Sequence, residues 1–305
     1  MSMGLANQAD HQSAASSWGR RLFASVKAVV RTPSARFGAV LFTLFAVVAL
    51  VGPFIAPFGE NEQILADARQ PPSSDHWFGT DHLGRDVFSR ILLGTRSIFL
   101  LAGSGTILAV LLGTTLGLLS GYTGGWLDEL LMRFFDSLLA LPALLLALLI
   151  LGTVRASFSE QVSAVGQGAG VLIVLVVVYT PIVARVVRSV VLEVKTRAYI
   201  DAARMVGESR LRILFREILP AVAPTLAVEA ALRFSYAIFL AASLGFLGIG
   251  VQPPNPDWGL MVNEARQNFF QVPWALYFPA AAISILIIAV NLLADGLKQA
   301  FQVKA

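Results

Sequence analysis

Six long apolar runs constrain the fold of this chain more than any other feature of its sequence. They cover residues 37–56, 97–120, 127–152, 169–194, 222–250 and 275–297. A run of roughly 20 apolar residues is the length that an α-helix needs to cross a hydrocarbon core about 30 Å thick. Lipid offers no partner for backbone N–H and C=O groups, so each run is expected to be helical. The sequence therefore predicts an all-α integral membrane protein with six transmembrane helices.

The composition agrees with this prediction and argues against several kinds of site. Hydrophobic residues make up 56% of the chain and charged residues 14%, and the mean hydropathy is +0.71, unlike a soluble domain of this length. The chain has no cysteine and only three histidines, and it contains neither an H-E-x-x-H nor a G-x-S-x-G motif. A membrane-bound hydrolase is therefore a poor second interpretation, and no catalytic residue is assigned.

Lysine and arginine are concentrated in three parts of the chain. Most of the 23 lie before the first run, between positions 185 and 216, and after the last run. Because cytoplasmic loops carry an excess of positive charge, both termini and the charged 198–220 segment are expected in the cytoplasm. Residues 1–36 would form an N-terminal tail with an interfacial helix around 18–30, retained rather than cleaved as a signal peptide.

The 198–220 segment is a compact charged element between two apolar runs, with the signals of two short helices. Asp201 suits the first turn of a helix, where its charge meets the helix dipole. Gly207 is expected to end that helix at the C′ position. Ser209 is a suitable N-cap for the second helix, and Pro220 is expected to close it.

The second of these helices is predicted to be amphipathic. Its apolar residues at helical spacing are Leu211, Leu214, Phe215 and Ile218, and arginines take the opposite side. On the water side of a membrane, such a face suits contact with a soluble protein. An ordinary amphipathic loop resting on the membrane surface is the alternative.

The 198–220 segment resembles the cytoplasmic loop of the binding-protein-dependent ABC importer permeases, whose pattern is E-A-A-x3-G-x9-I-x-L-P. The matching positions are Asp201 (in place of Glu), Ala202, Ala203, Gly207, Leu219 and Pro220. Glu217 occupies the family's Ile position, and Ile218 follows it. In this family the loop is a coupling helix that docks on a separate ATPase subunit. The resemblance implies the same role here for Asp201, Ala202, Ala203, Arg204, Gly207, Leu211, Leu214, Phe215, Leu219 and Pro220.

Two further motifs point to one subfamily, the permeases of peptide- and nickel-type importers. The stretch H-W-F-G-T-D-H-L-G-R-D-V-F-S-R, from His76 to Arg90, is similar to its G-T-D-x-x-G-R-D-x-x-S-R signature. The stretch from Ser243 to Met261 looks like its L-S-F-L-G-L-G-x-x-P-P-x-P-x-W-G-x-M motif, with Gly245 in place of Ser. Three motifs in the same order are far more specific than any one of them.

The resemblance implies the permease fold of type I ABC importers and a set of partners. A second, homologous permease subunit, two ABC ATPase subunits and an extracytoplasmic solute-binding protein would surround this chain in the bacterial inner membrane. ATP and Mg²⁺ would bind to the ATPases, because none of the four lysines here follows a glycine as a P-loop requires. The chain itself is expected to bind no cofactor, metal or nucleic acid. The cargo would be peptides, or nickel or another small solute.

The implied organisation has four parts. They are a cytoplasmic tail (1–36), a first transmembrane helix with an extracytoplasmic loop (37–96), a five-helix core that includes the 198–220 segment (97–297), and a short cytoplasmic tail (298–305). The loop of the second part is too long for a simple turn, and it contains its own helix signal. Val87, Phe88, Ile91 and Leu92 predict the apolar side of an interfacial helix, with Arg85, Ser89 and Arg90 turned elsewhere.

Aromatic and acidic residues near these loops carry further expectations. Trp77, and Trp258 after the fifth run, are expected at the level of the lipid headgroups. The titratable residues Asp75, His76, Asp81, His82 and Asp86 cluster in the sequence. Such a group suits a metal in principle, but capping and salt bridging within a structured loop is the favoured interpretation.

The fifth run carries two ionisable residues, Glu229 and Arg233, about one helical turn apart. Ionisable residues inside a membrane are functional suspects by default. They either border the translocation pathway or form an internal ion pair that locks helices together, and the second interpretation is favoured. The candidates for lining the pathway are Glu229, Arg233, Ser235, Tyr236 and Ser243. A secondary, ion-coupled transporter that uses this pair is the alternative function.

Small residues recur at every fourth position of the second run. They are Gly105, Ala109, Gly113, Gly117 and Gly121. Such a ridge lets another helix approach closely. The neighbour is expected to be a helix of this chain rather than a partner subunit.

Overall fold

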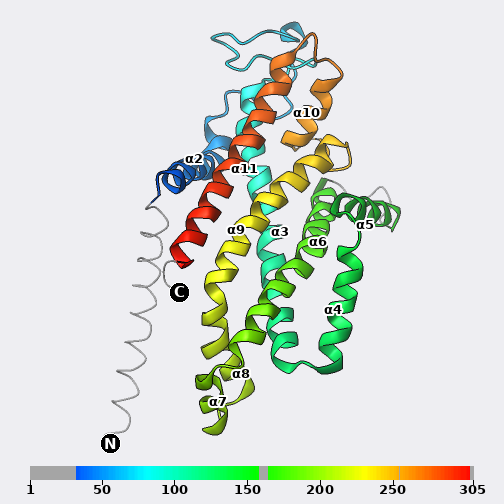
Figure 1. Cartoon of the computed structure of the whole chain (residues 1–305). Helices are drawn as coiled ribbons and strands as arrows, with labels where there is room; N and C mark the ends of the chain where they lie inside the picture. Colours follow the sequence, from blue (N-terminus) through cyan, green and yellow to red (C-terminus); the bar gives the residue numbers. More distant parts are fainter. Residues whose placement is uncertain (1–31, 158–163, 254, 303–305) are drawn as a thin grey trace, which may run out of the picture.

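The structure is a bundle of long helices (Figure 1). It is a computed structural model that describes residues 32–157, 164–253 and 255–302. The α-helices there are α2 (Pro33–Ile55), α3 (Val87–Thr123), α4 (Gly125–Leu139), α5 (Ala143–Ser157), α6 (Ala164–Val194), α7 (Ala198–Met205), α8 (Arg210–Arg212), α9 (Leu219–Phe246), α10 (Trp258–Arg266) and α11 (Pro273–Gln302). A short 3-10 helix, η1 (Leu65–Asp67), and a π-helical segment, η2 (Ile213–Ile218), are the other helical elements of these residues. The interfacial helix expected around 18–30 lies outside the described residues.

Five helical segments of the described residues are long and apolar enough to cross a membrane. They are Pro33–Ile55, Val87–Thr123, Gly168–Val194, Arg210–Phe246 and Pro273–Phe301. They cover five of the six predicted runs, so the prediction of a helical membrane protein is confirmed. The cytoplasmic location of the two termini stays a prediction.

The third predicted run is not one straight span. It forms α4 and α5, which meet at an angle of 95°. Pro142 stands directly before α5, and a proline disfavours the helical conformation of the residue that precedes it. The prediction of a single helix over 127–152 is therefore wrong. The count reaches six spans only if this bent pair is taken as one of them.

The most extensive helix packing in the described bundle is between α3 and α6. The two helices run in the same direction because α4 and α5 return the chain (Figure 1). A Cβ atom on Gly105 would lie 2.7 Å from the Leu175 side chain, and one on Gly113 would lie 2.6 Å from the Val183 side chain. Only glycine lets the two backbones come this close. The predicted small-residue ridge is confirmed, and its neighbour is a helix of this chain.

Buried apolar side chains form two clusters along the bundle. The larger cluster joins α3, α6, α9, α10 and α11. The smaller cluster joins the last turns of α6 to the 198–220 segment, through residues such as Val187, Val191, Ile200, Ile213 and Ile218. The 198–220 segment is therefore packed onto a transmembrane helix and is not a free loop.

The 57–86 loop and α10 lie at the end of the bundle opposite α7 (Figure 1). No separate interfacial helix precedes the second span, because α3 begins at Val87 and continues for 37 residues. Asp86 caps α3 by accepting a hydrogen bond from the Ser89 N–H at 2.7 Å. The apolar side that was predicted for a short interfacial helix thus belongs to the first turns of a transmembrane helix.

Trp258 is buried in this end of the bundle, so its expected place at the membrane interface is wrong. It has no exposed surface, and its indole N–H donates to the Ile91 carbonyl at 3.2 Å. Gly94 makes room for the indole ring, since a Cβ there would lie 2.8 Å from it. Gly245 is equally constrained, because a Cβ at this position would overlap the Asp257 carboxylate. The departure from the family motif at Gly245 therefore lets the proline-rich loop pack against α9.

Candidate functional site

The 198–220 segment forms a helix-turn-helix at the lower end of the bundle in Figure 1. Its turn is centred on Gly207, whose φ of +83° favours glycine over other residues. The Glu208 N–H donates to the Ala203 carbonyl at 3.1 Å, and the Gly207 N–H donates to the Arg204 carbonyl at 3.0 Å. These two bonds define a Schellman motif. The predicted role of Gly207 as the C′ residue is confirmed.

The second helix begins as predicted but does not end at Pro220. Ser209 caps it by accepting a hydrogen bond from the Arg212 N–H at 3.4 Å. A proline lacks an N–H, and its ring clashes with the carbonyl four residues earlier in an α-helix. The wider turn of η2 relieves this conflict, and the Leu219 N–H donates to the Leu214 carbonyl. As a result α8, η2 and α9 form one helical segment from Arg210 to Phe246.

One side of the 198–220 segment is buried against α6 and α9. Ile200, Ile213 and Ile218 are at most 1% exposed and belong to the smaller apolar cluster. Leu214 lies on the same side and is 4% exposed. The prediction that Leu214 shares an outward face with its apolar neighbours is therefore wrong. It assumed α-helical spacing, which η2 does not keep.

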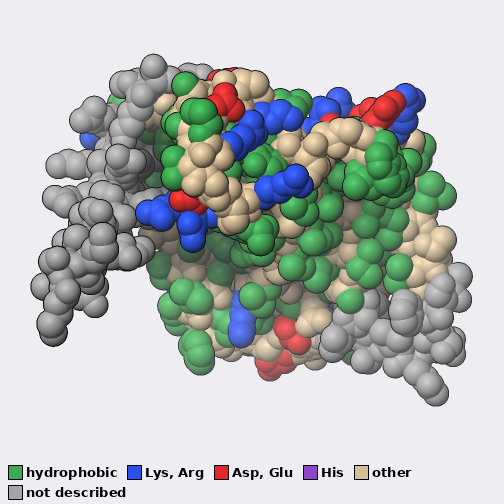
Figure 2. Space-filling view, turned by 90° about the horizontal axis from the view of Figure 1, so that it is seen from below, with side chains coloured by type: hydrophobic (Ala, Val, Ile, Leu, Met, Phe, Trp, Pro, Cys, Tyr) green, Lys and Arg blue, Asp and Glu red, His purple; other side chains and the backbone are tan. Residues whose placement is uncertain are grey.

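The other side of the segment leaves large apolar side chains uncovered. Leu211 and Phe215 are 64% and 63% exposed, and Met205 and Val206 are 83% exposed. Tyr199 is 42% exposed. We call these five residues the exposed apolar set. Figure 2, which views this end of the molecule, shows hydrophobic side chains between lysines and arginines.

Met205 and Val206 were missed by the sequence reasoning. The available signal was that two apolar residues stand directly before the Gly207 turn in an otherwise charged segment. In the structure they end α7 at the tip of the helix-turn-helix. They are the most exposed of the five residues in the exposed apolar set.

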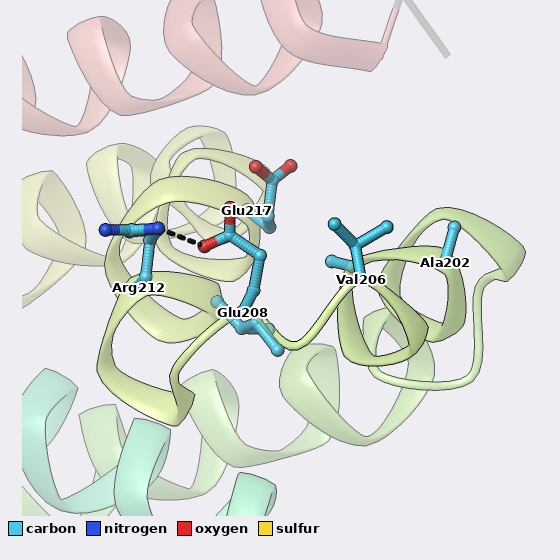
Figure 3. Close-up of a pocket in the computed structure, with 7 residues that line it drawn as sticks. Ala202, Val206, Glu208, Arg212 and Glu217 are labelled. Atoms are coloured by element: carbon cyan, nitrogen blue, oxygen red, sulfur yellow. Dashed lines mark ion pairs between the residues drawn. The ribbon is translucent and has the colours of Figure 1, made fainter.

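A hollow of about 240 Å³ lies between α7 and η2 (Figure 3). Its lining consists of Ala202, Ala203, Val206, Glu208, Arg212, Ile213 and Glu217. The Glu208 carboxylate and the Arg212 guanidinium pair at 3.1 Å, and Glu217 stands beside this pair (Figure 3). Ala202 and Ala203, which match the family pattern, line this hollow with small side chains.

Asp201 and Arg204, two further residues of the predicted coupling set, are paired with each other. Their charged atoms lie 3.1 Å apart, and both side chains are about half exposed. The Arg204 guanidinium also lies over the ring of Tyr122 in α3, 5.5 Å from its centre. A charged residue of α7 is in this way in contact with the end of a second transmembrane helix.

The Glu229–Arg233 pair is present on α9, as the sequence reasoning anticipated. Arg233 Nε lies 2.8 Å from Glu229 Oε1. The Arg233 guanidinium lies 4.9 Å from the centre of the Tyr236 ring and 5.9 Å from that of Tyr179 in α6. The Tyr179 hydroxyl donates to the Tyr236 carbonyl at 2.8 Å. Three of the pathway candidates are therefore neighbours on one helix.

The two serines predicted for the pathway do not join this group. Ser235 is 2% exposed, and its side chain is turned away from the open face on which Tyr236 lies half exposed. Ser243 is partly exposed, and its hydroxyl donates to the Phe239 carbonyl of its own helix at 2.8 Å. The buried position of Ser235 argues against a place on the pathway.

A buried charge cluster ties the 57–86 loop to α3 and α10. Arg85 Nε lies 2.6 Å from Asp81 Oδ2, and Arg85 Nη2 lies 2.6 Å from Glu264 Oε2. Arg90 Nη1 contacts the same two carboxylates at 3.0 and 3.2 Å. Both arginines are 3% exposed. The sequence placed them off the apolar side of an interfacial helix and did not predict their burial, which Glu264, far along the chain, makes possible by completing the cluster.

His76, Asp81 and Asp86 of the 57–86 loop serve capping and pairing, as the favoured interpretation proposed. His76 Nδ1 lies 2.9 Å from Oδ1 of Asp86, the residue that caps α3. Asp81 accepts hydrogen bonds from the backbone N–H groups of Leu83 and Arg85. Within residues 32–157, 164–253 and 255–302, no three His, Asp or Glu side chains are grouped so as to bind a metal.

Comparisons with known proteins agree on one family. Residues 113–304 match the family described as binding-protein-dependent transport system inner membrane component. Residues 26–72 match the N-terminal TM domain of oligopeptide transport permease C. The chain is 37% identical over 295 residues to the dipeptide transport system permease protein DppC of Alkalihalophilus pseudofirmus, with 97% of this chain and 92% of that one covered. It is 42% identical over 277 residues to the glutathione transport system permease protein GsiD of Escherichia coli and of Shigella boydii, with 90% and 88% covered.

Proposed function

Because the chain belongs to the family of binding-protein-dependent transport system inner membrane components, and is thus a multi-pass permease of the bacterial inner membrane, we propose that it imports small peptides. The relatives at 37% and 42% identity are permeases for dipeptides and for glutathione. Both solutes carry free carboxylate and ammonium groups. A short peptide with free termini is therefore the proposed cargo, ahead of nickel or another small solute.

The proposed assembly has four kinds of partner chain or surface. A second, homologous permease subunit would complete the pathway, and membrane lipid would surround the two. Two ABC ATPase subunits, which bind ATP and Mg²⁺, would dock on the cytoplasmic side. A solute-binding protein would deliver the peptide from the opposite side. The family membership of this chain supports each of these partners in kind.

The main support for the proposal is that the 198–220 segment is exposed on one side and packed onto a transmembrane helix on the other. Its outward side presents the exposed apolar set, whereas its inward side is packed onto α6. Through η2 the segment continues into α9 without a break. A partner that moves this outward side would therefore displace two transmembrane helices together, since packed helices transmit strain. Such a link is what coupling of ATP hydrolysis to alternating access requires.

The ion-coupled transporter is the weaker candidate function. It would use the Glu229–Arg233 pair as a proton or ion site, because a carboxylate at membrane depth is suited to this. The family membership and the exposed apolar set give this alternative no support. A self-powered carrier has no need of an uncovered apolar surface outside the membrane.

The proposal is tested by exchanging one exposed apolar residue at each end of the molecule. Val206→Asp alters the 198–220 segment, and Leu65→Asp is the matched control in the 57–86 loop, where the side chain is 73% exposed. Each variant is purified in mild detergent, its copurifying subunits are identified, and ATP hydrolysis is assayed. We expect P-loop ATPases with the wild type and with Leu65→Asp, but not with Val206→Asp. Retention of ATPase subunits and of peptide uptake by Val206→Asp would refute the docking role.

A further inference from the structure

The open faces of two transmembrane helices, α2 and α9, differ in chemistry. The large exposed side chains of α2 are Phe37, Val40, Leu44, Val47, Leu50, Val51, Phe54 and Ile55. This face is apolar throughout and suits lipid. On α9, Thr225 and Tyr236 are exposed and Ser243 is partly exposed. Their spacing places these three on one side of the helix, beside the exposed rings of Phe239 and Phe246. Ionisable groups at membrane depth face a water-filled cavity or protein rather than lipid.

The Glu229–Arg233 pair borders this polar face and has unused hydrogen-bonding capacity. The contacts of Arg233 within the described chain are the ion pair through Nε and the two tyrosine rings. Its two terminal nitrogens therefore have no acceptor there. Glu229 uses Oε1 alone, and the Tyr236 hydroxyl makes no hydrogen bond in the described residues. Arg233, Glu229 and Tyr236 thus bring unused hydrogen-bond donors and acceptors together at the exposed side of α9.

Burying these charged side chains is energetically costly unless their free donors and acceptors form hydrogen bonds. The Arg233 and Glu229 side chains are 12% and 11% exposed. Buried polar groups are nearly always satisfied in folded proteins, and the exceptions call for an explanation. The ion pair itself lies within α9, and its contact with α6 is that of the Arg233 guanidinium with the ring of Tyr179. The internal ion pair favoured from the sequence is therefore present, but neither this pair nor the Tyr179 contact gives the terminal nitrogens of Arg233 a hydrogen-bond acceptor in the described residues.

We propose that Glu229, Arg233 and Tyr236 form a recognition site for the two charged ends of the transported peptide. The terminal nitrogens of Arg233 offer the planar fork that binds a carboxylate through two hydrogen bonds. The free oxygen of Glu229 accepts from the peptide ammonium group. Tyr236 supports the guanidinium from one side, and the Tyr179 hydroxyl fixes Tyr236 to α6. The inference rests on the proposed function and adds a specificity-determining site to it.

This site makes a prediction about cargo chemistry. A peptide with both termini free would engage Arg233 and Glu229 at once. A peptide amide loses the carboxylate, and an N-acetyl peptide loses the ammonium group. The permease itself would then discriminate among these solutes, in addition to any selection by the binding protein.

The test uses the full complex in proteoliposomes, with ATP on the ATPase side and the binding protein on the other. The probes are alanyl-alanine, its C-terminal amide and its N-acetyl derivative. The variant is Glu229→Gln combined with Arg233→Gln, which removes both charges and so leaves no lone buried ion. Thr115→Ala in α3, whose exposed hydroxyl donates to the Leu111 carbonyl of its own helix, is the control. The measured quantity is the ratio of uptake rates, free peptide over blocked peptide.

We expect both ratios to fall about tenfold in the double variant, since a charge-assisted hydrogen bond contributes at least that factor. We expect them to stay unchanged in Thr115→Ala. The binding protein is the same throughout, so its own preference cancels between variants. Unchanged ratios in an assembled, ATP-hydrolysing double variant would overturn this inference and leave the proposed function standing. A double variant that fails to assemble while Thr115→Ala assembles would show that the pair is needed for the architecture of the complex, which also overturns the inference. A wild-type chain that binds no ATPase would instead refute the proposed function.

Discussion

Paired charges are buried at the end formed by the 57–86 loop and α10, whereas in the 198–220 segment at the other end they lie in the open. The side chains of Arg85 and Asp81 are 3% and 7% exposed, and those of Arg204 and Asp201 are 43% and 57% exposed. Both pairs join an arginine to an aspartate at hydrogen-bonding distance. Their surroundings therefore decide what they contribute.

The difference teaches which end is built for rigidity and which for contact. Removing one member of a buried pair leaves a charge without compensation, whereas an exposed pair is already screened by water. The buried charge cluster fixes a long loop onto α3 and α10. The 198–220 segment keeps its pairs at the rim and leaves the exposed apolar set uncovered. The following substitutions test this contrast, from the largest expected effect to the smallest.

The largest effect is expected from Arg90→Met, in the buried charge cluster. Asp81 and Glu264 would then share Arg85 alone, and breaking a buried pair in this way costs about 3–5 kcal/mol. The measurement is thermal unfolding of the purified protein in detergent. Arg197→Met is the matched control, because Arg197 pairs with Glu193 at 2.8 Å in the open. Equal melting temperatures for the two variants would break the comparison.

The next effect concerns Asp257, beside the same cluster. Burial raises the pKa of its carboxyl group to about 6, although the Leu260 and Gly259 N–H groups and Arg90 act in the opposite direction. The folded state therefore binds this proton more tightly than the unfolded state. Stability from this group is full below about pH 4 and is lost as the pH rises through 6, by about 3 kcal/mol in all.

Asp257→Asn should remove this pH dependence. The asparagine oxygen still accepts the Leu260 N–H that caps α10. We expect the variant to be more stable than the wild type at pH 7.5, with the difference shrinking toward pH 4.5. Melting temperatures of both proteins across this range measure it, and other carboxylates cancel in the difference. A difference that stays constant with pH would contradict the raised pKa.

Features set by neighbours in the sequence were predictable, and they include most of the fold. Five of the six apolar runs become long helices because lipid offers no hydrogen-bond partner to the backbone, whatever the helices pack against. Gly207 and Ser209 act within four residues of their own positions, and both predictions are confirmed. The small-residue ridge from Gly105 to Gly121 was also readable, since close helix approach needs small residues wherever the partner is.

Features set by distant residues were not predictable. Arg90 turns inward because it pairs with Glu264, and Trp258 turns inward because Gly94 leaves room for its ring. The residues next to Arg90 and Trp258 in the sequence do not indicate either contact. Pro220 looked like a helix end because proline breaks the α-helical hydrogen bonding. A π-helical turn is the less common solution, so the sequence did not predict that the helix continues through Pro220 into α9. The same turn moved Leu214 from the outward side to the core.

A smaller change in stability but a clear change in function is expected at Gly207. Valine there must adopt a positive φ, which costs about 1–2 kcal/mol, although the space around the position is open. Gly207→Asn is the matched control, since asparagine tolerates this conformation. We expect Gly207→Val to unfold only slightly earlier yet to lose substrate-stimulated ATP hydrolysis in the assembled complex. Normal stimulation in Gly207→Val would show that the turn is not needed for coupling.

The smallest effect is expected for Arg133→Gln in α4, and it separates exposure from position in the molecule. Arg133 pairs with Glu129 at 2.5 Å, and the two side chains are 75% and 65% exposed. If exposure alone decides what a pair contributes, the melting temperature should not change, as for the pairs of the 198–220 segment. The comparison between detergent and lipid bilayer then becomes informative. A stability loss that appears only in the bilayer would mean that this side of α4 faces lipid, where the remaining Glu129 charge is costly. A loss that appears only with the second permease subunit present would place this pair at the contact between the two subunits.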